Sequence, residues 1–403
     1  MRYFPFVFLF TIVSVAQAQT NYQVRLNFSI TNNSIQYQLR FTDQGLDKTI
    51  APVKESGKWV FKGSIEQKDP IWASVVEMED GEFSSVKSFW LGAGIVELKK
   101  KKDDELDEAE VVSKHPFQQH QDELDRILAP LKMAQNRIEL NLSQRPPVEQ
   151  VRDYMKQLDS LEKKEEQYKR DYIRKYPERY VGLHAMSYSM MDWGVDTTKA
   201  LFEKMSASLK ETSYGMKVRK FISLNKNIQE GSDVVDIVQL SPTGDTLRLS
   251  ALRGKWVLLD FWASWCGPCR DQNPELVELY SKWKDKGFEI FAVSLDQTKE
   301  DWVAAIKKDS LTWLHVSELN EFENTAAYVY GVNAVPTNFL IDPKGKVVKK
   351  DLEPDEIDEF LSEIFNTNAK HQKGLIQKGY SLASQLSMIV SKPNGLKSRI
   401  LHF

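Results

Sequence analysis

The chain has 403 residues, with 54 Lys and Arg against 57 Asp and Glu and a formal net charge of −3. This length exceeds what one hydrophobic core usually serves, so two or three domains are expected. The balanced charge gives no basic patch, which excludes nucleic acid as a predicted partner. Cys266 and Cys269 are the only cysteines, which excludes a framework of structural disulfides.

The N-terminal segment has the pattern of a secretory signal peptide. Arg2 precedes an apolar run over residues 3–15, and Ala16-Gln17-Ala18 then supplies the small residues of a cleavage site. The run is shorter than the roughly 20 apolar residues that span a bilayer. We expect residues 1–18 to be removed, which leaves an exported protein without a stable transmembrane segment. A retained membrane anchor is the alternative interpretation.

Residues 19–102 are predicted to form an antiparallel β-rich domain. Apolar and polar residues alternate over 22–30 and again over 35–41, on either side of a polar turn. This pattern predicts a β-hairpin. Further strands are expected at 58–65, 71–78 and 85–99, with turns at Gly57, Asp80-Gly81 and residues 92–94. We expect a small sandwich or barrel that acts as a spacer or as a partner-binding surface.

Residues 103–228 are predicted to be a charged linker followed by a helical region. Lysines at 99–102 and an acidic run over 103–110 form a charge block of both signs, which favours a solvated linker. Apolar residues then recur at helical spacing, including after Pro146-Pro147, a pair that suits a helix start. The six histidines include no set at metal-ligand spacing, so no metal site is predicted.

Residues 229–367 are predicted to be an α/β domain. Residues 256–262 are apolar apart from Asp260, which is typical of a parallel strand buried on both faces. Cys266-Gly267-Pro268-Cys269 follows at once, and a helical pattern begins after it, so Cys266 is expected beside a helix N-terminus. The remaining predicted elements are strands at 288–295, 312–316, 337–341 and 346–350, and helices at 299–308, 322–330 and 353–365.

A thiol at a helix N-terminus is suited to nucleophilic chemistry. Unpaired backbone N–H groups and the helix dipole stabilise a thiolate there, and a second thiol three residues on can donate a hydrogen bond to it. Together they lower a cysteine pKa from about 8.5 to about 7 or below. A Cys-x-x-Cys pair can also be half of a zinc site, but no second pair accompanies it. The pair therefore predicts redox chemistry without a metal or a cofactor.

The cysteine motif carries a family resemblance. Trp265-Cys266-Gly267-Pro268-Cys269 behind Asp260-Phe261-Trp262-Ala263 resembles the thioredoxin superfamily. The loop 331–337 resembles the loop of that superfamily whose proline, here Pro336, is cis. An additional strand–helix unit between Cys269 and Pro336 resembles the TlpA/ResA group. Residues 22–100 loosely resemble the β-rich domain of unassigned function that precedes the thioredoxin domain in many exported bacterial proteins.

The resemblance implies a fold and a set of roles. The fold is multi-domain: an N-terminal antiparallel β domain, a central helical region and a C-terminal α/β thioredoxin fold with an inserted strand–helix unit. Cys266 and Cys269 would form the redox-active disulfide, with Cys266 attacking a partner's disulfide and Cys269 resolving the mixed disulfide. The substrate-binding residues implied are Trp265, Gly267, Pro268, Val335 and Pro336.

Asp260 is the third predicted catalytic residue. It lies six residues before Cys266, where thioredoxins place a buried acid that accepts the proton of the resolving cysteine. Flanking Leu259 and Phe261 would desolvate the carboxyl, raise its pKa and suit it to proton transfer; a purely structural acid is the alternative. Where many TlpA/ResA proteins carry glutamate after the motif, this chain has Gln272, which cannot accept a proton.

The predicted function is an exported thiol-disulfide oxidoreductase of the periplasm that reduces protein disulfides, as in cytochrome c maturation or envelope thiol maintenance. Its expected partners are envelope proteins with disulfides or dithiols and a membrane-bound electron donor. One alternative is a thiol peroxidase of the peroxiredoxin type, although the Pro and Thr ahead of a peroxidatic cysteine are absent here. Another is a partner-binding module with only local redox activity. Residues 368–403 are expected to be a loose basic tail.

Overall fold

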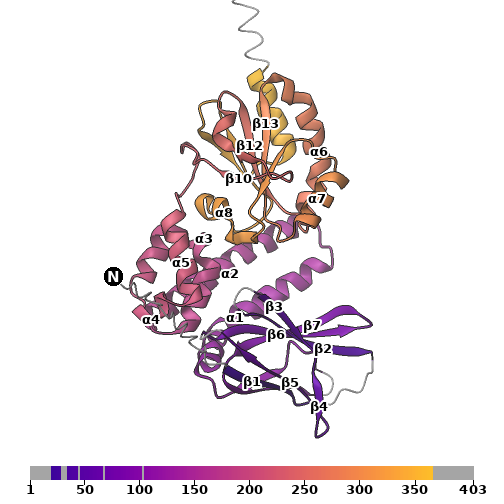
Figure 1. Ribbon diagram of the computed structural model, residues 1–403, viewed down its shortest axis with the longest axis vertical. Helices are drawn as coiled ribbons and strands as arrows, with labels where there is room; N and C mark the ends of the chain where they lie inside the picture. The colour runs from indigo at the N-terminus through magenta and orange to yellow at the C-terminus, as the bar shows by residue number, and fades with distance from the viewer. Residues whose placement is uncertain (1–19, 29–33, 44–45, 67–68, 102–103, 366–403) are drawn as a thin grey trace, which may run out of the picture. The chain divides into compact units, whose positions relative to one another are not determined.

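The computed structural model describes residues 20–28, 34–43, 46–66, 69–101 and 104–365 (Figure 1). The predicted signal peptide, 1–18, and the predicted basic tail, 368–403, lie outside the described residues. The chain divides into two compact units, Met1–Arg219 and Lys220–Phe403. Within the described ranges, every helix is too short or too polar to cross a bilayer.

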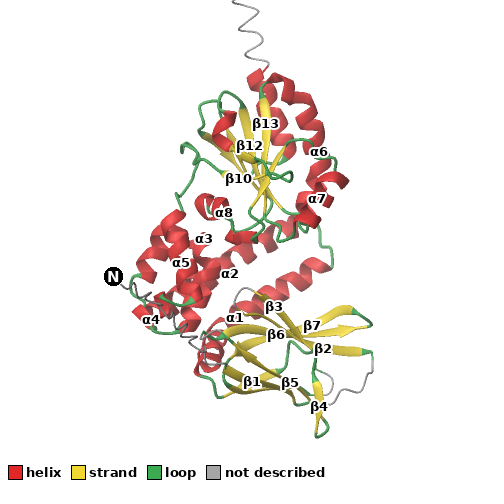
Figure 2. Ribbon diagram, viewed as in Figure 1, coloured by secondary structure: helices red, strands yellow, loops and turns green. Residues whose placement is uncertain are grey.

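The first unit opens with two β-sheets that enclose one core (Figure 2). Their strand orders are β4-β5-β1-β8-β9 and β3-β2-β6-β7. Alternating residues of β1 and β2 point inward, and Val24 and Leu39 are fully buried in the shared core. The strands are β1 (Thr20–Leu26), β2 (Ile35–Asp43), β3 (Leu46–Ile50), β4 (Val53–Glu55), β5 (Lys58–Ile65), β6 (Ile71–Glu79), β7 (Glu82–Leu91), β8 (Gly94–Lys99) and β9 (Glu110–Ser113).

The predicted hairpin between β1 and β2 is wrong. β1 pairs antiparallel with β5 and parallel with β8, whereas β2 pairs with β3 and β6 in the other sheet. The two strands face each other across the core instead, where the Tyr22 and Phe41 rings meet edge to face with centroids 5.8 Å apart. A period of two shows which face of a strand is buried but does not identify its hydrogen-bonding neighbour.

The predicted turn at Asp80-Gly81 is confirmed. Asp80 has φ 52° and Gly81 has φ 86°, and the two residues join β6 to β7, which pair antiparallel along their length. A two-residue hairpin turn with both central residues in the left-handed region matches the twist of the strands it joins. Glycine adopts that conformation without a steric penalty, and aspartate tolerates it better than most residues.

The charge block is not a linker. Leu106 and Ala109 are 0% and 1% exposed and belong to the core between the two sheets. The backbone N–H of Asp107 donates to Ser85 Oγ on β7 at 3.2 Å, and β9 then pairs antiparallel with β8. The β domain therefore extends to Ser113, beyond the predicted boundary at residue 102. Two apolar residues among many charges, Leu106 and Ala109, anchor this segment in the core, and the charge pattern concealed them.

The central region is helical, as predicted. Pro147 precedes the first residue of α2, where a missing N–H costs nothing. Arg179 lies at the start of α3 and donates to Glu123 of α1 at 2.6 Å and to the Tyr172 hydroxyl of α2 at 3.0 Å, so one guanidinium joins three helices. The helices are α1 (Pro116–Ser143), α2 (Val148–Lys175), α3 (Tyr180–Phe202), α4 (Ala207–Lys210) and α5 (Ser213–Leu224).

The second unit is built on a seven-stranded sheet of order β11-β10-β14-β13-β12-β15-β16. The predicted buried strand is β12, which pairs parallel with β13 and antiparallel with β15. Its strands are β10 (Val238–Leu240), β11 (Thr246–Arg248), β12 (Trp256–Trp262), β13 (Phe288–Ser294), β14 (Leu314–Ser317), β15 (Thr337–Ile341) and β16 (Val347–Lys350).

Helices cover both faces of this sheet. Phe261 of β12 meets Tyr330 of α8 with ring centroids 5.9 Å apart, whereas Trp256 meets Phe360 of the last helix, 354–365, at 5.6 Å on the opposite face. The strand–helix–strand order predicted between the cysteines and Pro336 is present as β13, α7 and β14. The helical elements are η1 (Leu249–Leu252), α6 (Gly267–Trp283), η2 (Lys284–Lys286), α7 (Lys299–Lys308), η3 (Glu321–Glu323) and α8 (Thr325–Tyr330).

The position of Leu106 in the core makes a testable prediction. Leu106→Ala should destabilise the β domain by about 2–5 kcal/mol, because it leaves a cavity in a closed core. The exposed neighbour change Glu105→Ala should stay within about 0.5 kcal/mol. Hydrogen exchange of the slowest β1 and β8 amides measures the opening free energy of this core. Equal effects of the two substitutions would restore the linker interpretation.

Candidate functional site

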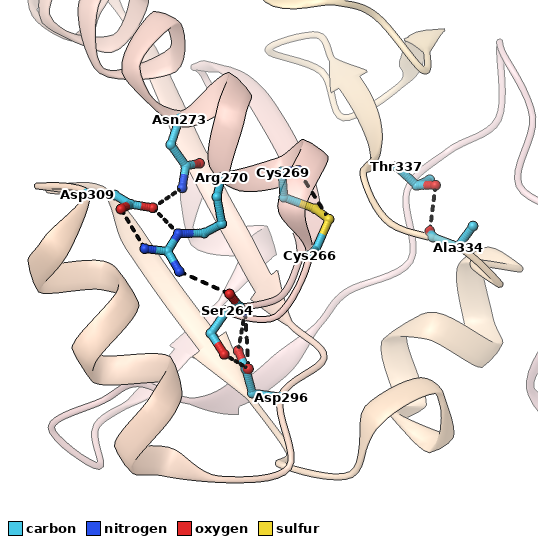
Figure 3. Close-up of a disulfide and its surroundings, with 9 residues drawn as sticks. All are labelled: Ser264, Cys266, Cys269, Arg270, Asn273, Asp296, Asp309, Ala334 and Thr337. Atoms are coloured by element: carbon cyan, nitrogen blue, oxygen red, sulfur yellow. Dashed lines mark hydrogen bonds and ion pairs between the residues drawn. A yellow bond between two sulfur atoms is a disulfide. The ribbon is translucent and has the colours of Figure 1, made fainter. Parts of the chain in front are cut away.

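The two cysteines form a disulfide where β12 gives way to α6 (Figure 3). The S–S distance is 1.97 Å and the Cα atoms are 5.3 Å apart. Cys266 is the N-cap residue of α6, and its Sγ accepts a hydrogen bond from the Cys269 N–H at 3.2 Å. The predicted position at a helix N-terminus is thus confirmed. In the reduced protein the same N–H groups and the helix dipole favour a thiolate at Cys266.

The disulfide is covered, but the residues around it are exposed. Cys266 and Cys269 are 4% and 3% exposed, so accessibility in the oxidised protein does not distinguish the two sulfurs. Trp265 is 52% exposed, and Gly267 and Pro268 are exposed as well. A partner that reaches the disulfide therefore meets these three residues first. The distinction between the sulfurs comes from the helix end, where Cys266 is the capping residue.

The loop before β15 lies at the same end of the sheet as the cysteines. Thr337, the first residue of β15, pairs with Phe261 near the end of β12, and Pro336 precedes it directly. The Val335–Pro336 peptide bond is cis, as predicted. Thr337 Oγ1 donates to the Ala334 carbonyl at 2.9 Å and closes the loop on itself (Figure 3). Val335 and Pro336 are half-buried, which leaves part of each accessible to a partner.

Asp260 is a buried acid on β12. Its side chain alternates with that of Phe261, which packs toward α8, so Asp260 points to the opposite face. That face carries the helix 354–365, on whose Phe365 the Trp283 ring of α6 stacks. The residue is 7% exposed, and burial raises the pKa of its carboxyl to about 7. The predicted direction of the shift is confirmed, and its cause is desolvation of the charged form.

Gln272 makes a contact that the sequence did not suggest. Its Nε2 donates to Glu353 Oε2 at 2.6 Å; Gln272 is half-buried and Glu353 is exposed. Glu353 immediately precedes the helix 354–365. A carboxylate therefore lies beside the first turns of α6 although residue 272 itself is an amide.

A second buried acid, Asp296, was missed by the sequence reasoning. It follows β13, is 1% exposed, and accepts hydrogen bonds from the Ser264 N–H at 3.1 Å, the Ser264 hydroxyl at 2.5 Å and the Ser294 hydroxyl at 2.6 Å. Because the carboxyl ends of neighbouring parallel strands meet at one edge of a sheet, a polar residue just after the strand 288–295 was the available signal.

Arg270 joins the start of α6 to the end of α7. Its guanidinium forms a two-pronged ion pair with Asp309, the residue that caps the C-terminus of α7, and Asn273 donates to the same carboxylate at 2.7 Å. This pairing lowers the pKa of Asp309, chiefly through the hydrogen bond from Arg270. Arg270 Nη1 also donates to the Ser264 carbonyl at 3.0 Å. These residues too escaped the sequence reasoning.

The described part of the chain contains no group of three or more His, Cys, Asp and Glu side chains arranged to hold a metal ion. The groups that this site positions for chemistry are the two sulfurs and the buried carboxyl of Asp260.

Comparison with known proteins is consistent with this chemistry. Residues 231–350 match the AhpC/TSA family. The chain is 35% identical to the thiol-disulfide oxidoreductase ResA of a Bacillus cereus strain over 131 residues, 32% of this chain and 73% of the relative. It is 35% identical to ResA of Bacillus subtilis (strain 168) over 124 residues, which are 31% of this chain and 68% of that relative. A crystal structure of the thioredoxin domain of a thiol-disulfide oxidoreductase from Bacteroides vulgatus matches 34% of this chain and 99% of that chain, at 33% identity and a TM-score of 0.33.

The raised pKa of Asp260 predicts a pH-dependent stability. The unfolded chain releases this proton near 3.8 and the folded protein near 7, so between these values the folded state binds more protons and loses stability as the pH rises. Asp260→Asn cannot ionise. Its advantage over the wild type should grow by roughly 4 kcal/mol from about pH 4 to about pH 7 and then stay constant. Urea unfolding of the two oxidised proteins at each pH measures this difference in the free energy of unfolding. If the free energies of the variant and the wild type changed in parallel with pH, the burial argument would be contradicted.

Proposed function

Since this chain belongs to the family of ResA-like thiol-disulfide oxidoreductases, we propose that it is an exported reductase of protein disulfides. The observation that carries the proposal is the position of Cys266 as N-cap of α6, with its sulfur bonded to the Cys269 N–H. The exposed residues around the disulfide and the Pro336 loop at the same sheet edge support it. We assign the redox domain to residues 229–367.

The reaction begins with the reduced protein. The Cys266 thiolate attacks one sulfur of the partner's disulfide, a mixed disulfide forms, and the other partner sulfur leaves as a thiolate that takes a proton. Cys269 then loses its proton and attacks the Cys266 sulfur. The mixed disulfide breaks, the Cys266–Cys269 bond forms, and the second partner sulfur leaves. Two electrons pass to the partner. Of the two protons that its leaving thiolates take up, Cys269 supplies one and solvent supplies the other, and a membrane-bound donor restores the dithiol.

Asp260 is the proposed acceptor of the Cys269 proton. Its carboxyl lies on the face of β12 that carries the helix 354–365, and its pKa of about 7 lets it exchange a proton near neutral pH. An acid at its ordinary pKa would be ionised throughout this range and would bind the proton too weakly. The raised pKa therefore supports the functional role of Asp260 over a purely structural one.

The exposed rim of the site is the proposed contact surface for the partner. Trp265 supplies a large apolar face, and the half-buried Val335 offers its backbone to an extended peptide. The remaining proposed contact residues are Gly267, Pro268 and Pro336. This surface suits a folded or extended protein chain that brings its own cysteine to Cys266.

Export follows from the predicted signal peptide at 1–18 and supports a place in the periplasm or cell envelope. The partners proposed there are envelope proteins with a disulfide or a dithiol, including apocytochromes in cytochrome c maturation. The β domain and the helical region would hold the redox domain at a distance or recognise the partner.

Trapping tests the proposed mechanism. Cys269→Ser removes the resolving thiol, so the mixed disulfide at Cys266 should accumulate with exported proteins and be released by dithiothreitol. Cys266→Ser is the matched control and should trap none of them. Equal trapping by both variants would contradict attack by Cys266. Rapid sulfenic acid formation at Cys266 with micromolar peroxide would favour the peroxidase alternative instead.

The reduction potential of the cysteine pair tests the proposed direction of electron flow. A reductase should have a potential nearer the about −270 mV of thioredoxin than the about −120 mV of a strong oxidant. Equilibration of the full chain with a dithiothreitol redox buffer gives this value. A potential above about −150 mV would overturn the assignment as a reductase.

A further inference from the structure

The residues between β12 and Cys266 form a tight turn. The Cys266 N–H donates to the Ala263 carbonyl at 3.2 Å, which makes Ser264 and Trp265 the central residues. Central residues of a turn have no backbone partners inside it. Both backbone groups of Ser264 nevertheless have side-chain partners: its N–H donates to Asp296 at 3.1 Å, and its carbonyl accepts from Arg270 at 3.0 Å (Figure 3).

The two partners of Ser264 are themselves fixed. Asp296 is held by the Ser294 hydroxyl at 2.6 Å, and its own N–H donates to the same oxygen at 3.0 Å. Arg270 is held by its ion pair with Asp309. The turn is therefore tied to the end of β13 on one side and, through Arg270, to α6 and the end of α7 on the other.

Burying the carboxylate of Asp296 costs free energy. Asp296 is 1% exposed, and a carboxylate removed from water is tolerated only when hydrogen bonds replace its hydration. Two of the donors to Asp296, an N–H and a hydroxyl, belong to Ser264, one residue of the three-residue connection into the redox motif. The bonds that Asp296 accepts from Ser264 therefore explain this buried charge better than a contribution to stability alone.

We propose that Asp296 and Arg270 are positioning residues for Cys266, which by holding both backbone groups of Ser264 keep the Cys266 sulfur at the N-terminus of α6 throughout the redox cycle. The role rests on the proposed function and deepens it. Neither residue bonds to a sulfur, so both act through Ser264. When the disulfide is reduced the covalent link between the sulfurs is lost, and the turn is then what keeps Cys266 Sγ near the Cys269 N–H.

Loss of the Asp296 side chain has two opposite effects on the pKa of the Cys266 thiol, one through charge and one through position. Removing the carboxylate of Asp296 removes a negative charge, which by itself would lower the thiol pKa. Releasing the turn moves the sulfur away from the helix end, which raises the thiol pKa and disfavours the dithiol form. The sign of the change in an alanine variant therefore separates a positioning role from a simple electrostatic one.

The test compares Asp296→Ala with Asp296→Asn in the full chain. The readout is the pH midpoint of Cys266 alkylation in the reduced protein, followed by mass spectrometry. Asp296→Ala should raise the midpoint by about one pH unit, a tenfold fall in the ratio of thiolate to thiol at a given pH. Asp296→Asn keeps an acceptor for the Ser264 N–H and should stay at or below the wild-type midpoint. The exposed Asp301→Asn is the matched control and should leave the midpoint unchanged.

A lowered or unchanged midpoint in Asp296→Ala would overturn the proposal. If that variant does not fold, Arg270→Lys decides: it keeps the charge but loses the planar fork that reaches both Asp309 and Ser264. Its midpoint should rise as well, and a wild-type value would overturn the proposal. The alkylation midpoints are measured on the two thiols alone and require no disulfide substrate. If the wild-type protein failed to reduce a disulfide, the proposed function would be refuted, whereas the positioning role would still be decided by the midpoints.

Discussion

The hydrogen bond from the Cys269 N–H to the Cys266 sulfur connects the fold of this protein to its chemistry. It exists because the buried strand β12 leads through a short turn into α6, so that a sulfur takes the place of the oxygen that usually caps a helix. The surrounding elements preserve this junction. β13 and β15 hold β12 in the sheet, and the ends of β13 and α7 supply the acids that tie down the turn between strand and helix.

Two buried carboxyls lie near the junction, and their surroundings give them different properties. Asp260 lies on the buried strand β12, where desolvation raises its pKa toward neutrality. Asp296 is as deeply buried but accepts several hydrogen bonds from Ser264 and Ser294. The first environment suits a group that exchanges protons, and the second suits a group that holds a backbone in place.

The sequence predicted those features that depend on neighbours along the chain. The buried strand, the thiol at a helix start and the raised pKa of Asp260 follow from adjacent residues, and each is present. The sequence did not predict features that depend on strand pairing. The partner of β1, the burial of Leu106 among charges and the contact of Asp296 with Ser264 all require knowledge of which strands are neighbours, because periodicity specifies a buried face and not a partner.

In the proposed mechanism, the position of Cys266 at the helix end, and not its accessibility, makes it the attacking thiol. Partial alkylation of the reduced wild-type protein between pH 5 and pH 9, with each cysteine quantified separately, tests this most directly. We expect Cys266 to be modified first, with a pKa well below the ordinary value of about 8.5, while Cys269 reacts little over the same range. Equal reaction of the two thiols, with both titrating near about 8.5, would contradict it.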